Sequence, residues 1–122
     1  MRKYDITALG EILIDFVPDG TDSVGDMRLI RKAGGAPLNV LATAAKAGLN
    51  TAFIGRVGDD LLGDFLIDTV RSCGISCDYI KRDVEHNTTL AFVELDSMGD
   101  RRFSFYRTYG ADRFICETDV DK

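Results

Sequence analysis

Apolar residues follow two different spacings along the first part of the chain. Residues 6–10 and 51–55 are short apolar runs typical of buried strands, and residues 11–17 and 27–31 are further extended segments. Two segments instead repeat their apolar residues at helical spacing: Leu38, Leu41, Ala42 and Ala45, and then Leu62, Phe65, Leu66, Val70 and Cys73. The order of strand, helix, strand and helix predicts an α/β fold with a parallel sheet covered by helices.

The pattern changes after the second helical segment. Residues 88–95 and 101–108 are extended, and in the latter Phe103 and Phe105 share one face while their neighbours lie on the other. A stretch rich in turn-forming residues joins the two segments. We therefore predict an antiparallel hairpin inserted into the α/β chain.

Charge and length limit the class of protein. The chain has 122 residues, a net charge of −5 and no run of Lys and Arg, which argues against nucleic-acid binding and a membrane-surface role. No apolar run approaches the ~20 residues of a transmembrane helix, and the apolar start is too short for a signal peptide, so we expect a cytoplasmic protein. Two β-α units would leave a parallel sheet poorly covered, and we expect the N-terminal part of a larger fold.

The cysteines and the single histidine form no recognisable metal or redox motif. Cys73 and Cys77 are separated by three residues rather than two, and Cys116 lies far from them in the sequence. We expect three buried free thiols in a reducing compartment. His86 lies in a polar segment and is predicted to be a solvated turn residue, so neither a zinc site nor a Ser-His-Asp triad is expected.

The most informative segment is Gly34-Gly35-Ala36-Pro37-Leu38-Asn39, at the start of the first helical pattern. Glycine lacks a Cβ, so a ligand can contact the main chain at Gly34 and Gly35. Pro37 suits the first turn of a helix, whose free N–H groups favour electron-rich ligand atoms. The segment is either a site for a small polyhydroxylated molecule or only a tight strand-to-helix turn.

Three polar side chains are further candidates for such a site. Asp15 could accept hydrogen bonds from two neighbouring sugar hydroxyls, each worth about 1.5–3 kcal/mol, or it could be a solvated residue of its strand. Asn39 could bind hydroxyls as donor and acceptor, or make a local bond at the helix start. Arg107 could reach a hydroxyl or carboxylate of a ligand, or be a solvated charge.

A glycine spacing at residues 58–63 matches that of a phosphate-binding loop. The loop is followed by Asp64 and Phe65 instead of Lys and Ser or Thr, and an acidic residue there would repel phosphate. We therefore predict a tight bend whose Asp59 or Asp60 caps the following helix.

Four segments in this order resemble the ribokinase-like sugar kinases, also called the PfkB carbohydrate kinases. The opening strand ends in Gly10-Glu11-Ile12-Leu13-Ile14-Asp15, and the Gly34-Gly35 segment is similar to the first signature of that family. The other two matches are Gly55-Arg56-Val57-Gly58-Asp59-Asp60 with Gly63, and Phe105-Tyr106-Arg107 with Gly110-Ala111-Asp112. The resemblance covers essentially the whole chain.

The resemblance implies a doubly wound, Rossmann-like parallel sheet with covering helices and a small β-sheet lid. It places the core units at about residues 1–10 and 33–77, and the lid strands at about residues 11–32 and 78–108. It implies transfer of the γ-phosphoryl group of ATP to a sugar hydroxyl, with Mg²⁺. Apart from the resemblance, apolar lid residues such as Phe103 and Phe105 could pair two copies as a homodimer. The implied substrate-binding residues are Asp15, Gly34, Gly35, Asn39, Phe105 and Arg107.

The substrate that the resemblance favours is fructose. The Ala-Pro-Leu-Asn sequence at residues 36–39 most resembles fructokinases, and differs from the Lys-Gly-Ala-Asn of ribokinases. Arg107 matches a lid arginine of both fructokinases and 2-keto-3-deoxygluconate kinases, and the latter are the nearest alternative. A non-catalytic sugar-binding or regulatory protein on the same fold is an alternative of another class.

The second family signature, D-x-x-G-A-G-D, is absent from the 122 residues. In the family it carries the catalytic base and the glycine-rich anion hole, and the ATP pocket lies in the same C-terminal part. We therefore expect no catalytic, cofactor-binding or metal-binding residue in this chain, and no kinase turnover from these 122 residues alone.

Overall fold

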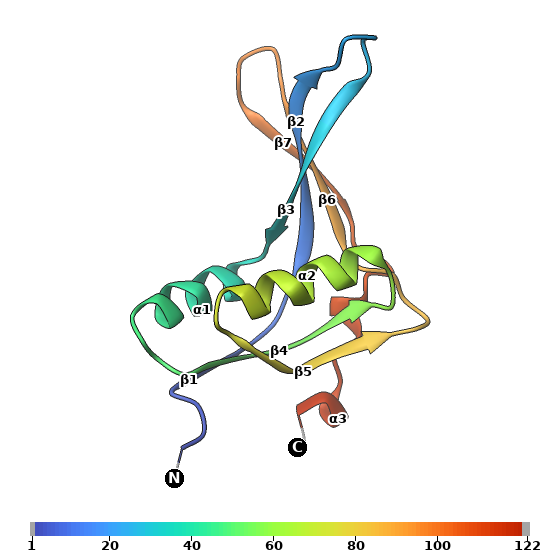
Figure 1. The fold of residues 1–122 in the computed structure, drawn as a ribbon. Helices are drawn as coiled ribbons and strands as arrows, with labels where there is room; N and C mark the ends of the chain where they lie inside the picture. Colours follow the sequence, from blue (N-terminus) through green and yellow to red (C-terminus); the bar gives the residue numbers. More distant parts are fainter. Residues whose placement is uncertain (1, 121–122) are drawn as a thin grey trace.

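The computed structural model describes residues 2–120. These residues form an α/β layer and a second sheet that projects from it (Figure 1). The α/β layer contains three strands in the order β1-β4-β5, and the second sheet, here called the lid sheet, contains four in the order β3-β2-β6-β7. The strands are β1 Ile6–Leu9, β2 Leu13–Thr21, β3 Met27–Gly34, β4 Thr51–Gly58, β5 Ser76–Asp83, β6 Leu90–Leu95 and β7 Arg101–Tyr106. The predicted α/β class with an inserted hairpin is confirmed.

Two helices cover the strands of the α/β layer, as predicted (Figure 1). Helix α1 spans Ala36–Lys46 and has a proline in its first turn. Helix α2 spans Leu61–Ser72, and the carboxylate of Asp60 accepts a hydrogen bond from the Gly63 N–H at 2.7 Å. The prediction that an aspartate caps this helix is therefore confirmed, and the capping residue is Asp60.

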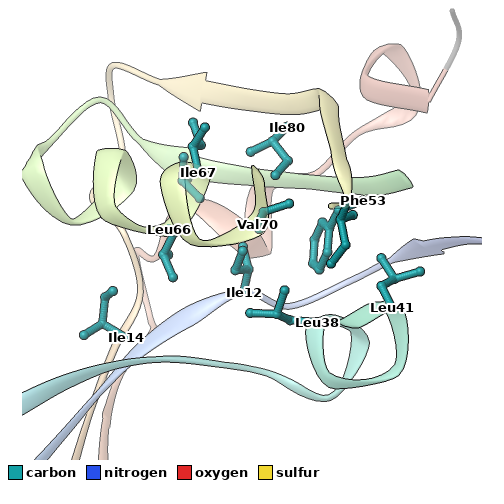
Figure 2. Close-up of a cluster of buried hydrophobic side chains, with 11 residues drawn as sticks. Ile12, Ile14, Leu38, Leu41, Phe53, Leu66, Ile67, Val70 and Ile80 are labelled. Atoms are coloured by element: carbon teal, nitrogen blue, oxygen red, sulfur yellow. The ribbon is translucent and has the colours of Figure 1, made fainter. Parts of the chain in front are cut away.

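One hydrophobic cluster joins the two parts of the molecule (Figure 2). Phe53, Leu41 and Leu66 come from β4, α1 and α2, whereas Ile12 and Ile14 come from the base of the lid sheet. All five are essentially buried, and truncation of such a side chain to alanine typically costs about 2–5 kcal/mol. The base of the lid sheet is thus anchored in the same core as the helices.

The lid sheet has two chemically different faces. Parallel pairing of β2 with β6 sets Asp15 beside Ala91, and antiparallel pairing of β6 with β7 sets Ala91 beside Phe105. Side chains alternate across a strand, so these three residues share one face. The rings of Phe16, Phe92 and Tyr106 form a contact series on the opposite face, with centroids 5.2 and 5.4 Å apart.

The predicted lid range of residues 78–108 is wrong at its beginning. Strand β5 pairs in parallel with β4 and belongs to the α/β layer, and only β6 and β7 of this range join the lid sheet. The first lid hairpin also runs further than predicted, because β3 continues to Gly34. A short alternating segment shows which residues are extended but does not show which strand they pair with.

The expectation of three buried thiols is also wrong. Cys73 and Cys77 are half-buried and Cys116 is exposed. Cys73 is the C-terminal capping residue of α2, and Cys77 lies on the edge strand β5. At both positions neighbouring elements cover the side chain on only one side. All three thiols are free.

The C-terminal segment is held to the α/β layer by buried charges. It contains a 3₁₀ turn, η1 (Ala111–Phe114), and one helical turn, α3 (Glu117–Val120). The Arg56 guanidinium on β4 lies 3.1 Å from Asp83 and 2.9 Å from Asp119. Arg56 alternates along β4 with Phe53 and Val57, which face the helices, so α3 lies on the opposite side of the sheet.

His86 is not the solvated turn residue that the sequence predicted. Its ring stacks on Phe114 with centroids 3.6 Å apart, and its Nδ1 lies 3.0 Å from Asp83 Oδ2. Asp83 lies only three residues before His86, whereas Phe114 becomes its neighbour only when the C-terminal segment packs on the sheet. Across residues 2–120, no helix combines the length and apolar character needed to cross a membrane.

Candidate functional site

The first part of the site is the Asp15 carboxylate, which packs directly against the main chain of a glycine. Asp15 on β2 faces Gly34, the last residue of β3, and a Cβ added to Gly34 would overlap the Asp15 Oδ2 atom. Burial raises the pKa of Asp15 above its ordinary value, the nearby Glu11 charge raises it further, and Lys32 opposes both. Asp15 is thus a partly desolvated hydrogen-bond acceptor beside a close main-chain approach.

Helix α1 begins two residues after Gly34, directly after the end of β3 (Figure 1). Gly35 has a φ of 113°, which L side chains rarely adopt, and a Cβ there would lie 2.7 Å from the Glu11 carbonyl oxygen. Both the backbone conformation and the space therefore require glycine. Asn39 lies one turn further along α1 with an exposed side chain, and its N–H lies 3.5 Å from the Gly35 carbonyl oxygen.

Arg107 lies at the base of the lid sheet, directly after β7, between two carboxylates. Its Nη1 atom is 3.3 Å from Glu11 Oε2, and its Nη2 atom is 3.4 Å from Asp112 Oδ2. The alternative of a merely solvated charge does not describe Arg107, because its side chain is about 38% exposed and paired on two sides.

Asp112 is the buried and hydrogen-bonded carboxylate of this group. Its side chain is fully buried, and Thr89 donates a hydrogen bond from Oγ1 to Asp112 Oδ1 at 2.5 Å. Gly110 makes the contact possible, because a Cβ there would overlap the Thr89 hydroxyl. Asp112 Oδ2 has no hydrogen-bond partner among the described residues and faces only the guanidinium of Arg107 at ion-pair distance.

Sequence reasoning missed Glu11 and Asp112 as members of the site. In an extended segment every second side chain lies on the same face, so the spacing of residues 11, 13 and 15 places Glu11 on the side of Asp15. This signal could have identified Glu11. Asp112 carried no such signal, because its burial depends on contacts with Thr89 and Arg107 that form only in the folded chain.

The face that carries Asp15 is hollowed beside the lid strands. One cavity of about 350 Å³ is lined by Asp15, Lys32 and Phe103 among others. A second cavity, of about 300 Å³ at the lower end of β6 and β7, is lined by Phe105 and Arg107 and also by Tyr106, whose ring belongs to the opposite face. These volumes lie at the lower end of the range for small-molecule sites. Of the six residues predicted for the site, the structure therefore places three on cavity walls and three at the junction of β3 and α1.

The glycine-spaced turn at residues 58–63 does not fit a phosphate group. The Asp60 carboxylate occupies the start of α2, where it accepts hydrogen bonds from the Gly63 N–H and from the N–H and hydroxyl of Thr88. No group of metal-ligating side chains is found in the described part of the chain.

Similarity to known proteins extends over nearly the whole chain. It is 38% identical over 118 residues to fructokinase-2 of Oryza sativa, which covers 95% of this chain and 35% of the rice protein. The structure of a fructokinase from Xylella fastidiosa aligns with a TM-score of 0.87 at 38% identity, covering 93% of this chain and 37% of that one. A Vibrio cholerae fructokinase described as bound to fructose, ADP and calcium aligns with a TM-score of 0.79 at 33% identity, over 93% of this chain and 35% of its own.

These matches concern a part of each relative. The chain spans about a third of the length of the relatives that it matches. Within that third, the order of elements, the lid sheet and the glycine-to-helix junction described above all coincide with one family. Residues 3–120 match the family described as pfkB family carbohydrate kinase, and the chain belongs to that family.

Proposed function

We propose that this chain is the sugar-binding and lid part of a cytoplasmic, ATP-dependent fructokinase, which converts D-fructose to fructose 6-phosphate. The observation that carries the proposal is the Asp15 carboxylate lying on the bare main chain of Gly34, on the hollowed face of the lid sheet. The similarity to fructokinases over 95% of the chain supports the choice of fructose. The activity belongs to a longer protein that contains residues 1–122.

Each proposed role follows from the chemistry of the side chain. Asp15 accepts hydrogen bonds from sugar hydroxyls, each worth about 1.5–3 kcal/mol. Gly34 and Gly35 let the sugar approach the main chain, and Asn39 donates to one hydroxyl while accepting from another. Phe105 packs on the carbon skeleton of the sugar, and Arg107 binds from the base of the lid.

The nucleotide and Mg²⁺ would be bound by residues outside this chain. They supply the phosphoryl group and stabilise its charge during transfer. The residues described here position the sugar hydroxyl and, with the lid closed, exclude water from the reaction. A mixture of ATP, Mg²⁺, fructose and the 122-residue chain alone is accordingly expected to show no turnover above a protein-free control.

Substitution of Asp15 in the full-length protein tests the proposal. Asp15→Ala removes the acceptor of two hydrogen bonds, so kcat/KM for fructose should fall by about a hundredfold or more. Asp68→Ala, which removes an exposed carboxylate from α2, is the matched control and should leave the kinetics unchanged. Wild-type kinetics in Asp15→Ala would contradict the proposed role.

A 2-keto-3-deoxygluconate kinase is the second candidate function. Arg107 favours it, because a guanidinium beside the cavity could bind the carboxylate of a keto acid. A phosphorylation screen with fructose, ribose and the keto acid distinguishes the two kinases. If none of the three compounds is phosphorylated but at least one still binds, the result would instead support a non-catalytic sugar-binding protein.

The lid sheet is also the surface through which we propose two copies to pair. Phe103 and Phe105 stack with centroids 5.8 Å apart and are both about half exposed or more. Burying these rings between two copies would remove apolar surface from water. Light scattering should find a dimer for the full-length protein and a larger monomer fraction for Phe103→Ser; a monomeric wild type would refute the pairing.

A further inference from the structure

Two cations at the base of the lid sheet, Arg107 and Lys32, act on carboxylates of the same chain. Arg107 lies between Glu11 and Asp112 at 3.3 and 3.4 Å. Lys32 is the register partner of Asp15 across β2 and β3, and its charge acts on that carboxylate. Glu11, Asp15 and Asp112 thus outnumber Arg107 and Lys32, so this group of five side chains carries a net negative charge, while Arg31 lies instead over the Phe65 ring at 4.0 Å from its centroid.

Glu11 is the central member of this group. Its main chain contacts the start of α1 at Gly35, its charge acts on Asp15, and its side chain reaches Arg107. Glu11 also differs from Asp112 in exposure: the Glu11 side chain is about 36% exposed, whereas that of Asp112 is fully buried. Glu11 is thus the carboxylate that an incoming ligand would meet.

We propose that Glu11 is the specificity-determining residue of this site, and that it selects neutral sugars against sugar acids by occupying the guanidinium of Arg107. The inference rests on the proposed function and deepens it, because it assigns the substrate class to a residue that the motifs did not single out. Glu11 acts through Arg107, so it is a positioning residue.

The physical argument compares the two substrate classes at Arg107. The carboxylate of a sugar acid would have to displace Glu11 from Arg107, or remain near Glu11 and Asp15 with a like charge, and both are unfavourable. A neutral sugar leaves the Arg107–Glu11 pair intact and finds donors and acceptors around it. The buried Asp112 holds the other side of the guanidinium in place, so Arg107 cannot turn fully toward a new anion.

The test measures kcat and KM of the full-length protein for fructose and for 2-keto-3-deoxygluconate. The wild type should favour fructose in kcat/KM by about a hundredfold or more. In Glu11→Gln this preference should fall at least tenfold, chiefly through a lower KM for the acid. Glu11→Asp, which keeps the charge, should retain most of the preference, and Glu94→Gln, which removes an exposed charge of β6, should leave it unchanged.

A second measurement needs no variant. The uncharged amide of the same acid should be at least a tenfold better substrate of the wild type than the acid itself, because the repulsion disappears with the charge. An unchanged preference in folded Glu11→Gln, or an amide no better than the acid, would overturn the inference and leave the sugar kinase proposal intact. If the wild type phosphorylated neither sugar, the proposed function itself would fail, and this inference with it.

Discussion

Two arginines of this protein each lie between two carboxylates, but in different surroundings. Arg56 in the α/β layer is 3.1 and 2.9 Å from Asp83 and Asp119, and both carboxylates are almost fully buried. Arg107 at the base of the lid is 3.3 and 3.4 Å from Glu11 and Asp112, and Glu11 is partly exposed. The first group, here called closed, has the shorter distances and two carboxylates that are almost fully buried, with the half-exposed Lys81 as a second cation 3.3 Å from Asp119. The second group, here called open, has longer distances and includes the partly exposed Glu11, and its Arg107 lines a cavity.

This difference distinguishes ion pairs that stabilise the fold from ion pairs whose partners a ligand can replace. A closed group cannot exchange partners, because any loss leaves a buried charge without compensation. An open group includes one carboxylate that water or substrate can reach, so its partners can be exchanged at a lower cost. We therefore assign Arg56 to the attachment of the C-terminal segment, and this comparison supports the proposed role of Arg107 in binding substrate.

The largest change in stability is expected from substituting the arginine of the closed group. Arg56→Met removes the cation shared by the buried Asp83 and Asp119 and leaves them only the His86 ring and Lys81, so it should lower the free energy of unfolding by about 3 kcal/mol. Chemical denaturation of the full-length protein measures the change. Arg71→Met removes an exposed pair with Asp68 and should change stability by less than about 0.5 kcal/mol. Equal effects of the two variants would refute the assignment of Arg56.

Acidification should weaken the same group. Burial opposes the charge of Asp83, but N–H groups of residues 85 and 86, the His86 ring and Arg56 together lower the pKa of Asp83 from 3.8 to about 2. The pKa is lower in the folded state, so this stabilisation is present above pH 3.8 and is lost as the pH falls toward 2. The loss amounts to about 2 kcal/mol for this change of pKa.

Unfolding curves recorded between pH 6 and the acid limit measure this loss. Asp83→Asn should be less stable at neutral pH and should show a flatter pH dependence than the wild type. Asp68→Asn, on the exposed face of α2, should keep the wild-type dependence. Parallel curves for the wild type and Asp83→Asn would show that the group does not titrate as described.

A smaller effect is expected from changing the main chain of the open site. Gly34→Ala places a methyl group on the Asp15 carboxylate, so the KM for fructose should rise by about tenfold, which corresponds to about 1.4 kcal/mol. Gly48→Ala has open space but a φ of 88°, so it should lower stability and leave KM unchanged. A Gly34→Ala enzyme with wild-type KM would remove the case for contact between sugar and main chain.

Local patterns sufficed for the helices, most of the strands and several site positions. Helices α1 and α2 followed from apolar spacing, and the turn before α2 followed from its capping aspartate. Gly34 and Gly35 were predicted as a candidate site from two glycines before a helix, whereas the family resemblance supplied the role of Asp15, and these roles stay predictions. Such features depend on neighbours a few residues apart in the chain, which is why a single sequence contains them.

The pairing of strands and the partners of buried charges could not be predicted in this way. Strand β5 joined the α/β layer instead of the lid, because an alternating segment does not specify its neighbour. Arg107 gained Glu11 and Asp112, and His86 gained Phe114, through contacts between distant segments. Family resemblance supplied the role of Arg107, but it supplied neither of these carboxylate partners.

The sequence by itself determined where the chain bends, which faces are apolar and where a ligand can approach bare main chain, because steric and hydrophobic preferences act locally. Only the tertiary structure decided which charges meet at the base of the lid and how far each is removed from water. Electrostatic interactions depend on distance and burial in space rather than on separation along the chain. The preference that we propose for neutral over charged sugars therefore depends on the fold that brings Arg107, Glu11 and Asp112 together.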